Sequence, residues 1–246
     1  HLPQLVAVVD FSDSIDNSSA VDGGLLSVIG NKRVVLCQVP ICNIHRKKIK
    51  RKLMKIVIFN VGPALSAYIE MGSNKIVVDL GKGNDFSMVN DFLLPLFKKR
   101  GKLKYLRDKY YLSQVFISHP HLDHISDLDD LEKHFYINLF TTPNDLSKGS
   151  ESYKNVNWNL VDDPGSNEVK KVKEVYKGRY LPLRVCDPSR MTIGYLYPGW
   201  VENNSTLRNE SYTNNISIVL YIHSGYRIFF AADIQKEGMK KLLEDN

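Results

Sequence analysis

Three histidines and an aspartate lie within six residues, in the segment HPHLDH that follows the apolar stretch Val115–Ile117. Because side chains alternate along an extended chain, His119 and His121 can turn to the same side and share one metal ion. Asp123 and His124 follow after a bend and can reach a second ion. Imidazole favours zinc, iron, copper or nickel, and a carboxylate also admits manganese. The segment therefore predicts a metal site, with zinc as the expected metal.

Packing alone is the competing interpretation of this segment. One histidine beside an apolar strand usually serves a structural purpose, but three of the seven histidines of the chain fall here. Buried imidazoles and carboxylates each need polar partners of their own, so packing explains the cluster poorly.

Strands and helices are predicted on both sides of the segment. Alternation and turn residues predict strands over residues 55–60 and 75–80, with 67–70 pairing between them. Residues 216–223 and 226–231 predict a second hairpin. Apolar residues at spacings of three and four predict a helix directly after the segment, at Ile125, Leu128, Leu131 and Phe135. The metal-binding pattern thus lies at a junction between a strand and a helix.

The pattern His-x-His-x-Asp-His after a short strand, with Ser118 before it, resembles the signature of the metallo-β-lactamase superfamily. The resemblance implies an α+β fold, a four-layer αββα sandwich with one or two metals at its edge. It also implies that His119, His121, Asp123 and His124 are metal ligands. The expected cofactor is two zinc ions, with manganese or iron as alternatives.

Two aspartates outside the segment complete the implied site. Asp79 ends a predicted strand, and the resemblance implies that it orients a site histidine by a hydrogen bond. An ordinary turn aspartate is the alternative. Asp233 stands where the family has Gly-Asp, here preceded by Ala232, and the resemblance implies a carboxylate that bridges both metals. Such a bridge keeps two metals about 3.5 to 4 Å apart.

Two further segments resemble the ComEC-type branch of the family, which is tied to DNA uptake. Residues 61–66 (VGPALS) match its Val-Gly-Gln-Gly-Asp-Ser stretch in part, and residues 214–217 (NNIS) match its Asn-Asn-x-Ser segment. Residues 135–222 contain no histidine where the family usually supplies one, so Asn214 and Asn215 are predicted to line the site. Only thirteen residues follow Asp233, and we expect the family's last histidine to lie beyond Asn246.

The N-terminal part differs from the rest of the chain. Residues 1–53 lack methionine, and Met54 comes directly before the first predicted strand. We therefore expect residues 1–53 to be a non-native or disordered extension. Residues 54–246 are expected to form the metallo-β-lactamase-like domain, incomplete at its C-terminus. Residues 46–55 carry seven Lys and Arg without an acid, which could bind nucleic acid, although a solvated run is favoured. Cys37, Cys42 and His45 lack a fourth ligand for a metal knuckle.

Composition indicates a globular domain. The chain is 43% hydrophobic and 24% charged, and no stretch approaches the roughly 20 apolar residues of a membrane span. Three scattered cysteines form no disulfide framework. A cytoplasmic location is expected; the oligomeric state is left open.

The ligands predict a hydrolase. Metals at this site would acidify a shared water, with Asp123 orienting it or taking its proton. A phosphodiester or nucleic acid is the first choice of substrate, and an acyl or lactam substrate is an alternative. Two other hypotheses are a non-catalytic binding or regulatory module with a degenerate site, and an iron-dependent oxidoreductase.

Overall fold

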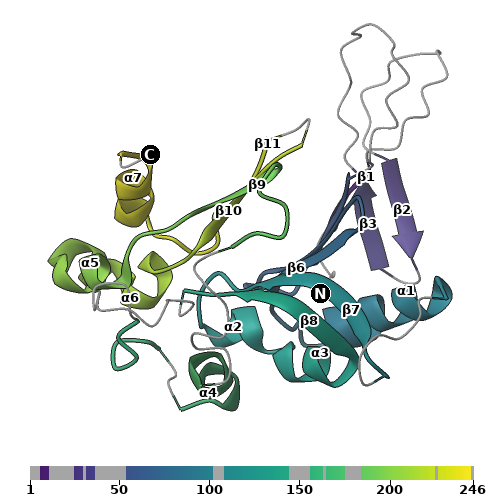
Figure 1. Ribbon diagram of the computed structural model, residues 1–246, viewed down its shortest axis with the longest axis horizontal. Helices are drawn as coiled ribbons and strands as arrows, with labels where there is room; N and C mark the ends of the chain where they lie inside the picture. The colour runs from purple at the N-terminus through teal and green to yellow at the C-terminus, as the bar shows by residue number, and fades with distance from the viewer. Residues whose placement is uncertain are drawn as a thin grey trace, which may run out of the picture.

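Two β-sheets frame the protein (Figure 1). The computed structural model describes the backbone of residues 6–10, 25–29 and 32–36, and residues 54–101, 108–143, 156–162, 165–174, 184–224 and 227–244. The larger sheet contains β1 (Val6–Asp10), β2 (Leu25–Ile29), β3 (Lys32–Leu36), β4 (Met54–Ile58), β5 (Ser66–Met71), β6 (Asn74–Leu80), β7 (Tyr110–Phe116) and β8 (Phe135–Thr141), in the order β2-β3-β1-β4-β5-β6-β7-β8. The smaller sheet, ordered β11-β10-β9, contains β9 (Met191–Gly194), β10 (Val219–His223) and β11 (Arg227–Phe230).

The strands on both sides of the metal-binding segment confirm the predicted hairpins. Strands β4, β5 and β6 pair in antiparallel fashion, as do β10 and β11. Strands β6, β7 and β8 run parallel. Because the carboxyl ends of parallel strands meet at one sheet edge, the end of β6 at Leu80 and the end of β7 at Phe116 lie together. That edge carries both Asp79 and the segment HPHLDH.

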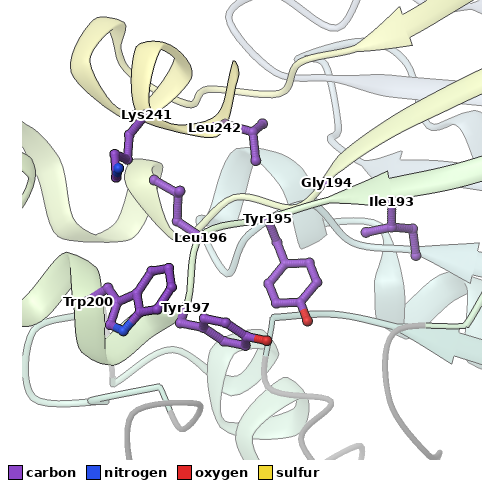
Figure 2. Close-up of a pocket in the computed structure, with 8 residues that line it drawn as sticks. All are labelled: Ile193, Gly194, Tyr195, Leu196, Tyr197, Trp200, Lys241 and Leu242. Atoms are coloured by element: carbon purple, nitrogen blue, oxygen red, sulfur yellow. The ribbon is translucent and has the colours of Figure 1, made fainter. Parts of the chain in front are cut away.

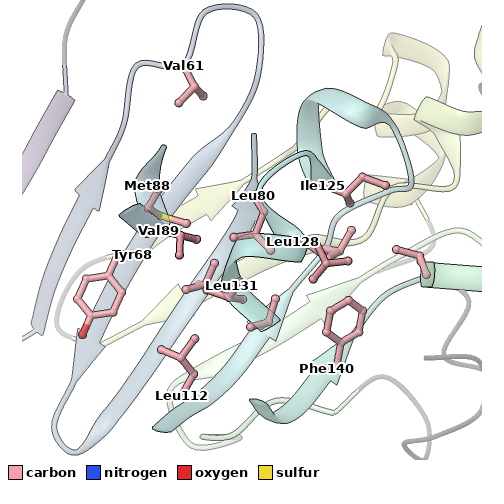
Figure 3. Close-up of a cluster of buried hydrophobic side chains, with 14 of the residues drawn as sticks. Val61, Tyr68, Leu80, Met88, Val89, Leu112, Ile125, Leu128, Leu131 and Phe140 are labelled. Atoms are coloured by element: carbon pink, nitrogen blue, oxygen red, sulfur yellow. The ribbon is translucent and has the colours of Figure 1, made fainter. Parts of the chain in front are cut away.

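Alternate residues of the central strands face two separate cores. Val57, Tyr68 and Val77 belong to the core beneath the helices, which also holds the leucines of the helix that follows the metal-binding segment (Figure 3). Ile56 and Ile69, the immediate neighbours of Val57 and Tyr68 in the sequence, belong to the core between the two sheets. This period-two alternation explains why the strands are nearly continuous apolar runs.

Eight helical segments surround the sheets: η1 (Met88–Leu93), α1 (Leu94–Lys99), α2 (Leu122–Ile125), α3 (Leu128–His134), α4 (Asn167–Glu174), α5 (Pro198–Asn203), α6 (Ser205–Asn215) and α7 (Lys236–Glu244) in the described part of the chain. Helices α1 and α3 lie against the larger sheet, while α5, α6 and α7 gather at one end of the smaller sheet (Figure 1). The fold is therefore mixed α/β. The four-layer sandwich, the end of the domain and its boundary at residue 53 stay predictions.

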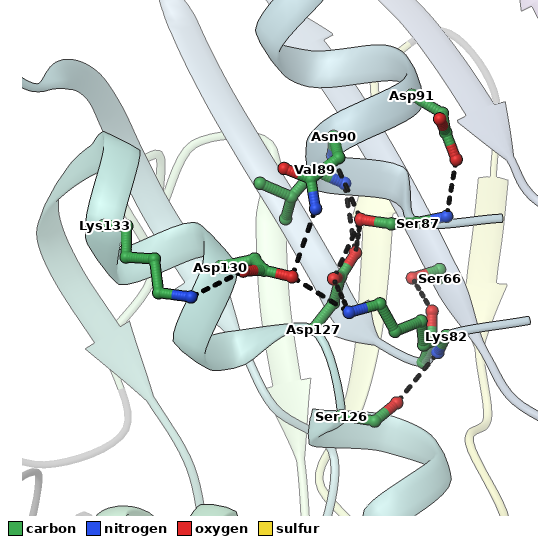
Figure 4. A network of polar contacts seen from close by, with 11 residues as sticks. Ser66, Lys82, Ser87, Val89, Asn90, Asp91, Ser126, Asp127, Asp130 and Lys133 are labelled. Atoms are coloured by element: carbon green, nitrogen blue, oxygen red, sulfur yellow. Dashed lines mark hydrogen bonds and ion pairs between the residues drawn. The ribbon is translucent and has the colours of Figure 1, made fainter.

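The prediction of one continuous helix over residues 125–135 is wrong, because two short helices, α2 and α3, occupy this region. The chain breaks at Ser126 and Asp127, where the Asp127 N–H donates to Leu80 O at 2.8 Å. The buried Asp127 carboxylate accepts from Ser87 Oγ at 2.7 and 2.9 Å and from Val89 N at 3.1 Å (Figure 4). Contacts to β6 and η1 therefore override the local apolar period.

Replacing Asp127 with alanine is expected to lower the free energy of unfolding by about 3 kcal/mol, measured by urea denaturation. The change leaves the buried Ser87 hydroxyl and Val89 N–H without this acceptor, and each orphaned group costs about 1–3 kcal/mol. Asp130→Ala is the control, since its ion pairs with Lys82 and Lys133 lie at the surface and are worth less than about 1 kcal/mol. Equal losses in the two variants would contradict this account.

The described residues contain no helix with the length and apolar character needed to cross a bilayer.

Candidate metal centre

The loop after β7 brings the three histidines of HPHLDH together. His119 is fully buried, with Nδ1 3.0 Å from Ser118 Oγ and Nε2 2.9 Å from His121 Nδ1. The rings of His119 and His121 meet edge to face at 4.7 Å, and those of His119 and His124 lie 4.2 Å apart. The imidazoles therefore form one compact cluster at the sheet edge.

Asp79 fixes this cluster from the neighbouring strand. Its buried carboxylate accepts from Ser118 N and Oγ, both at 2.7 Å, and contacts His124 Nδ1 at 2.8 Å. Asp79 adopts the left-handed backbone conformation, with φ of 53°, which aspartate tolerates better than most residues. The predicted contact between Asp79 and a site histidine is present, and it leaves His124 Nε2 as the free ring nitrogen.

Gly81 lets the two segments approach closely. A Cβ at this position would lie 2.2 Å from Asp123 O and 2.8 Å from Leu65 O. Lys82 N also donates to Ser126 Oγ at 2.9 Å. A side chain larger than hydrogen at residue 81 would push the start of α2, and Asp123 with it, away from β6.

Two carboxylates approach the free nitrogen of His124. Asp233 Oδ2 lies 3.5 Å and Asp123 Oδ2 3.9 Å from His124 Nε2. This nitrogen is buried and makes no hydrogen bond to the described residues. One ligand atom from each of His119, His124 and Asp233 lies within 4.8 Å of the others. An orphaned buried nitrogen among imidazoles and carboxylates fits a divalent metal, because these are the donors that such ions prefer.

Asp162 is a site residue that the sequence did not reveal. Its Oδ2 lies 2.8 Å from His121 Nε2, across forty-one residues of chain. It belongs to the polar loop between β8 and α4, and no spacing or motif distinguished it from the other aspartates there. Only the folded chain brings it to His121.

Asn214 and Asn215 were both predicted to line the site, but their side chains differ in hydrogen bonding. Asn215 is buried: its Nδ2 donates to Leu207 O at 2.9 Å, and its Oδ1 accepts from Gln235 N at 3.0 Å. It therefore holds the loop that carries Asp233. Asn214 Oδ1 is buried without a hydrogen bond to the described residues.

A pocket of about 690 Å³ lies between the end of β9 and α7 (Figure 2). Tyr195, Tyr197, Trp200 and Leu242 line it. Tyr197 meets Tyr195 and Trp200 edge to face at 5.3 and 4.9 Å, so these rings pack on one another, while Trp200 is half-exposed.

Burial and neighbouring charges shift the pKa values of His119, His124 and Asp233. Burial lowers the pKa of His119 well below its usual value, and the neighbouring His124 and His121 lower it further. Burial also lowers the pKa of His124, but contacts with Asp233 and Asp79 outweigh this effect and raise it to about 10. The contact with His124 holds the pKa of Asp233 below its usual value. Without metal, His124 is therefore positively charged at neutral pH.

The metal-free protein is expected to be most stable near pH 6.5. Between the ordinary histidine value of about 6.5 and about 10, folded His124 keeps its proton while the unfolded chain releases it, so up to about 1.4 kcal/mol of stability disappears per pH unit as the pH rises. As pH falls below about 6.5, unfolding lets His119 take up a proton, which also destabilises the fold.

Urea denaturation of chelator-treated protein between about pH 5 and 9 measures this profile. His124→Gln should remove the decline on the alkaline side and leave the acid side in place. A stability that increases from neutral to alkaline pH would contradict the assignment of the charge to His124.

Comparison with known families agrees with this geometry. A family model described as the metallo-beta-lactamase superfamily matches residues 61–197, more than half of the chain, including the segment HPHLDH. The chain belongs to the metallo-β-lactamase superfamily. Comparisons with curated proteins and with solved structures gave no match.

Proposed function

We propose that this protein is a metal-dependent hydrolase that holds one or two divalent metals, zinc first, with manganese or iron as alternatives. The observation that carries the proposal is that one ligand atom from each of His119, His124 and Asp233 lies within 4.8 Å of the others, with His121 Nδ1 only 2.9 Å from His119 Nε2. When bound, such metals acidify water and stabilise negative charge on a substrate oxygen.

We assign a separate role in metal binding or water activation to each residue of the site. His119, His121 and His124 would hold the metals, and Asp233 would supply a carboxylate ligand. Asp123 is 41% exposed and its carboxylate faces His124 Nε2, so it contacts both the site and the solvent. That position suits a group that orients the attacking water or accepts its proton.

A phosphodiester, in a nucleic acid or a smaller molecule, is the proposed substrate. Asp123 and Asp233 both approach His124 Nε2, and if the site holds two metals, they would stabilise both the attacking and the leaving oxygen in phosphoryl transfer. The resemblance of residues 214–217 to the ComEC-type branch supports the same choice. In this structure Asn215 of that segment positions the Asp233 loop through Gln235.

Elemental analysis and hydrolysis assays on one sample test the proposal. We expect one to two equivalents of metal, and cleavage of bis-nitrophenyl phosphate and of DNA that stops after chelation and returns with added metal. Metal without cleavage of either substrate, but with cleavage of a lactam or acyl ester, would overturn the substrate class. Absence of metal would favour a non-catalytic module, and iron with redox activity would favour an oxidoreductase.

A further inference from the structure

The two ring nitrogens of each site histidine have separate partners. His124 Nδ1 contacts Asp79 and His119 Nδ1 contacts Ser118, so that both Nε2 atoms face inward. His121 is turned the opposite way: its Nδ1 lies 2.9 Å from His119 Nε2, and its Nε2 lies 2.8 Å from Asp162 Oδ2. Because the two nitrogens of an imidazole point in diverging directions, a metal held by His119 Nε2 would meet Nδ1 of His121, the nitrogen that does not contact Asp162.

Asp162 is itself held in place by α6. Its backbone N–H donates to Thr213 Oγ1 at 3.0 Å, and Thr213 is fully buried. Five residues earlier, Asn157 N donates to Tyr212 Oη at 2.8 Å. The short segment 156–162 is thus attached to two successive residues of α6 before it reaches His121.

We propose that Asp162 is a positioning residue that accepts the Nε2 proton of His121 and so fixes the tautomer that presents Nδ1 to the metal. A neutral imidazole carries one proton, and a carboxylate at Nε2 keeps that proton away from Nδ1. Asp162 thereby serves His121 as Asp79 serves His124. This inference rests on the proposed metal site and adds the residue that orients its outermost histidine.

The test is the dissociation constant for Zn²⁺ alone, measured by chelator competition in the full chain. We expect Asp162→Ala to weaken the tightest site about 10- to 100-fold, the effect typical of losing a carboxylate behind a ligating histidine. Asp162→Asn keeps an oxygen that accepts from Nε2, so it should recover most of the affinity. Asp129→Ala removes an aspartate that contacts Lys171 outside the histidine cluster, so it should leave the affinity unchanged.

Two further measurements make the outcome decisive. The visible spectrum of the Co²⁺ form should be the same in wild type and Asp162→Asn, because Asp162 is not a ligand; a changed coordination spectrum would overturn the inference. His121→Ala should weaken Zn²⁺ binding at least as much as Asp162→Ala. If His121→Ala binds Zn²⁺ normally, the proposed metal site fails; if only Asp162→Ala binds normally, the positioning role alone is overturned.

Discussion

Replacing both His121 and Asp123 with alanine is expected to lower kcat/KM for phosphodiester cleavage by about a thousandfold or more. The pair removes one proposed metal ligand and the carboxylate proposed to orient the attacking water, which together would supply at least about 4 kcal/mol of transition-state stabilisation. Both side chains are partly exposed, at 20% and 41%, so the fold should survive the change. Steady-state kinetics with bis-nitrophenyl phosphate measure the effect.

The single variants should lose nearly as much activity as the double variant, because ligands of one site act as a unit. His223→Ala is the matched control: His223 is exposed on β10, its ring stacks on Tyr221, and its loss should leave kcat/KM unchanged. Circular dichroism separates loss of chemistry from loss of fold. A double variant that retains full activity would refute the assignment of the active site to HPHLDH.

Replacing Asp79 with alanine is expected to lower the free energy of unfolding of the metal-free protein by about 3–5 kcal/mol and to abolish metal binding. Three hydrogen bonds end on this carboxylate, two from Ser118 and one from the charged His124; removing one partner of a buried pair typically costs this much. Urea denaturation measures the first effect and elemental analysis the second.

Asp108 provides the control for backbone strain at Asp79. Both aspartates have positive φ, 53° and 59°, but Asp108 is exposed. Asp108→Ala should therefore report only the difference between aspartate and alanine in the left-handed region, which is smaller than the roughly 1–2 kcal/mol that this region costs any residue with a Cβ. If Asp79→Ala cost no more than Asp108→Ala, the hydrogen bonds of Asp79 would not hold the cluster.

Local patterns in the sequence predicted part of the fold correctly. Alternation and turn residues located β4, β5, β6 and the hairpin of β10 and β11, since strand faces and tight turns depend on near neighbours. The continuous helix over 125–135 failed at Asp127. Its N–H and carboxylate contact Leu80, Ser87 and Val89, partners thirty-eight or more residues away that no local period could reveal.

The sequence by itself determined which residue types gather at the candidate site: HPHLDH supplies three imidazoles and a carboxylate, and its spacing after a strand indicated the family. Only the tertiary structure decided how those donors are oriented. The parallel pairing of β6 and β7 carries Asp79 to His124, and the attachment of residues 156–162 to α6 carries Asp162 to His121. Which nitrogen of these two imidazoles faces inward depends on these distant carboxylates, because either ring nitrogen can be the metal donor until a neighbour holds the proton on the other.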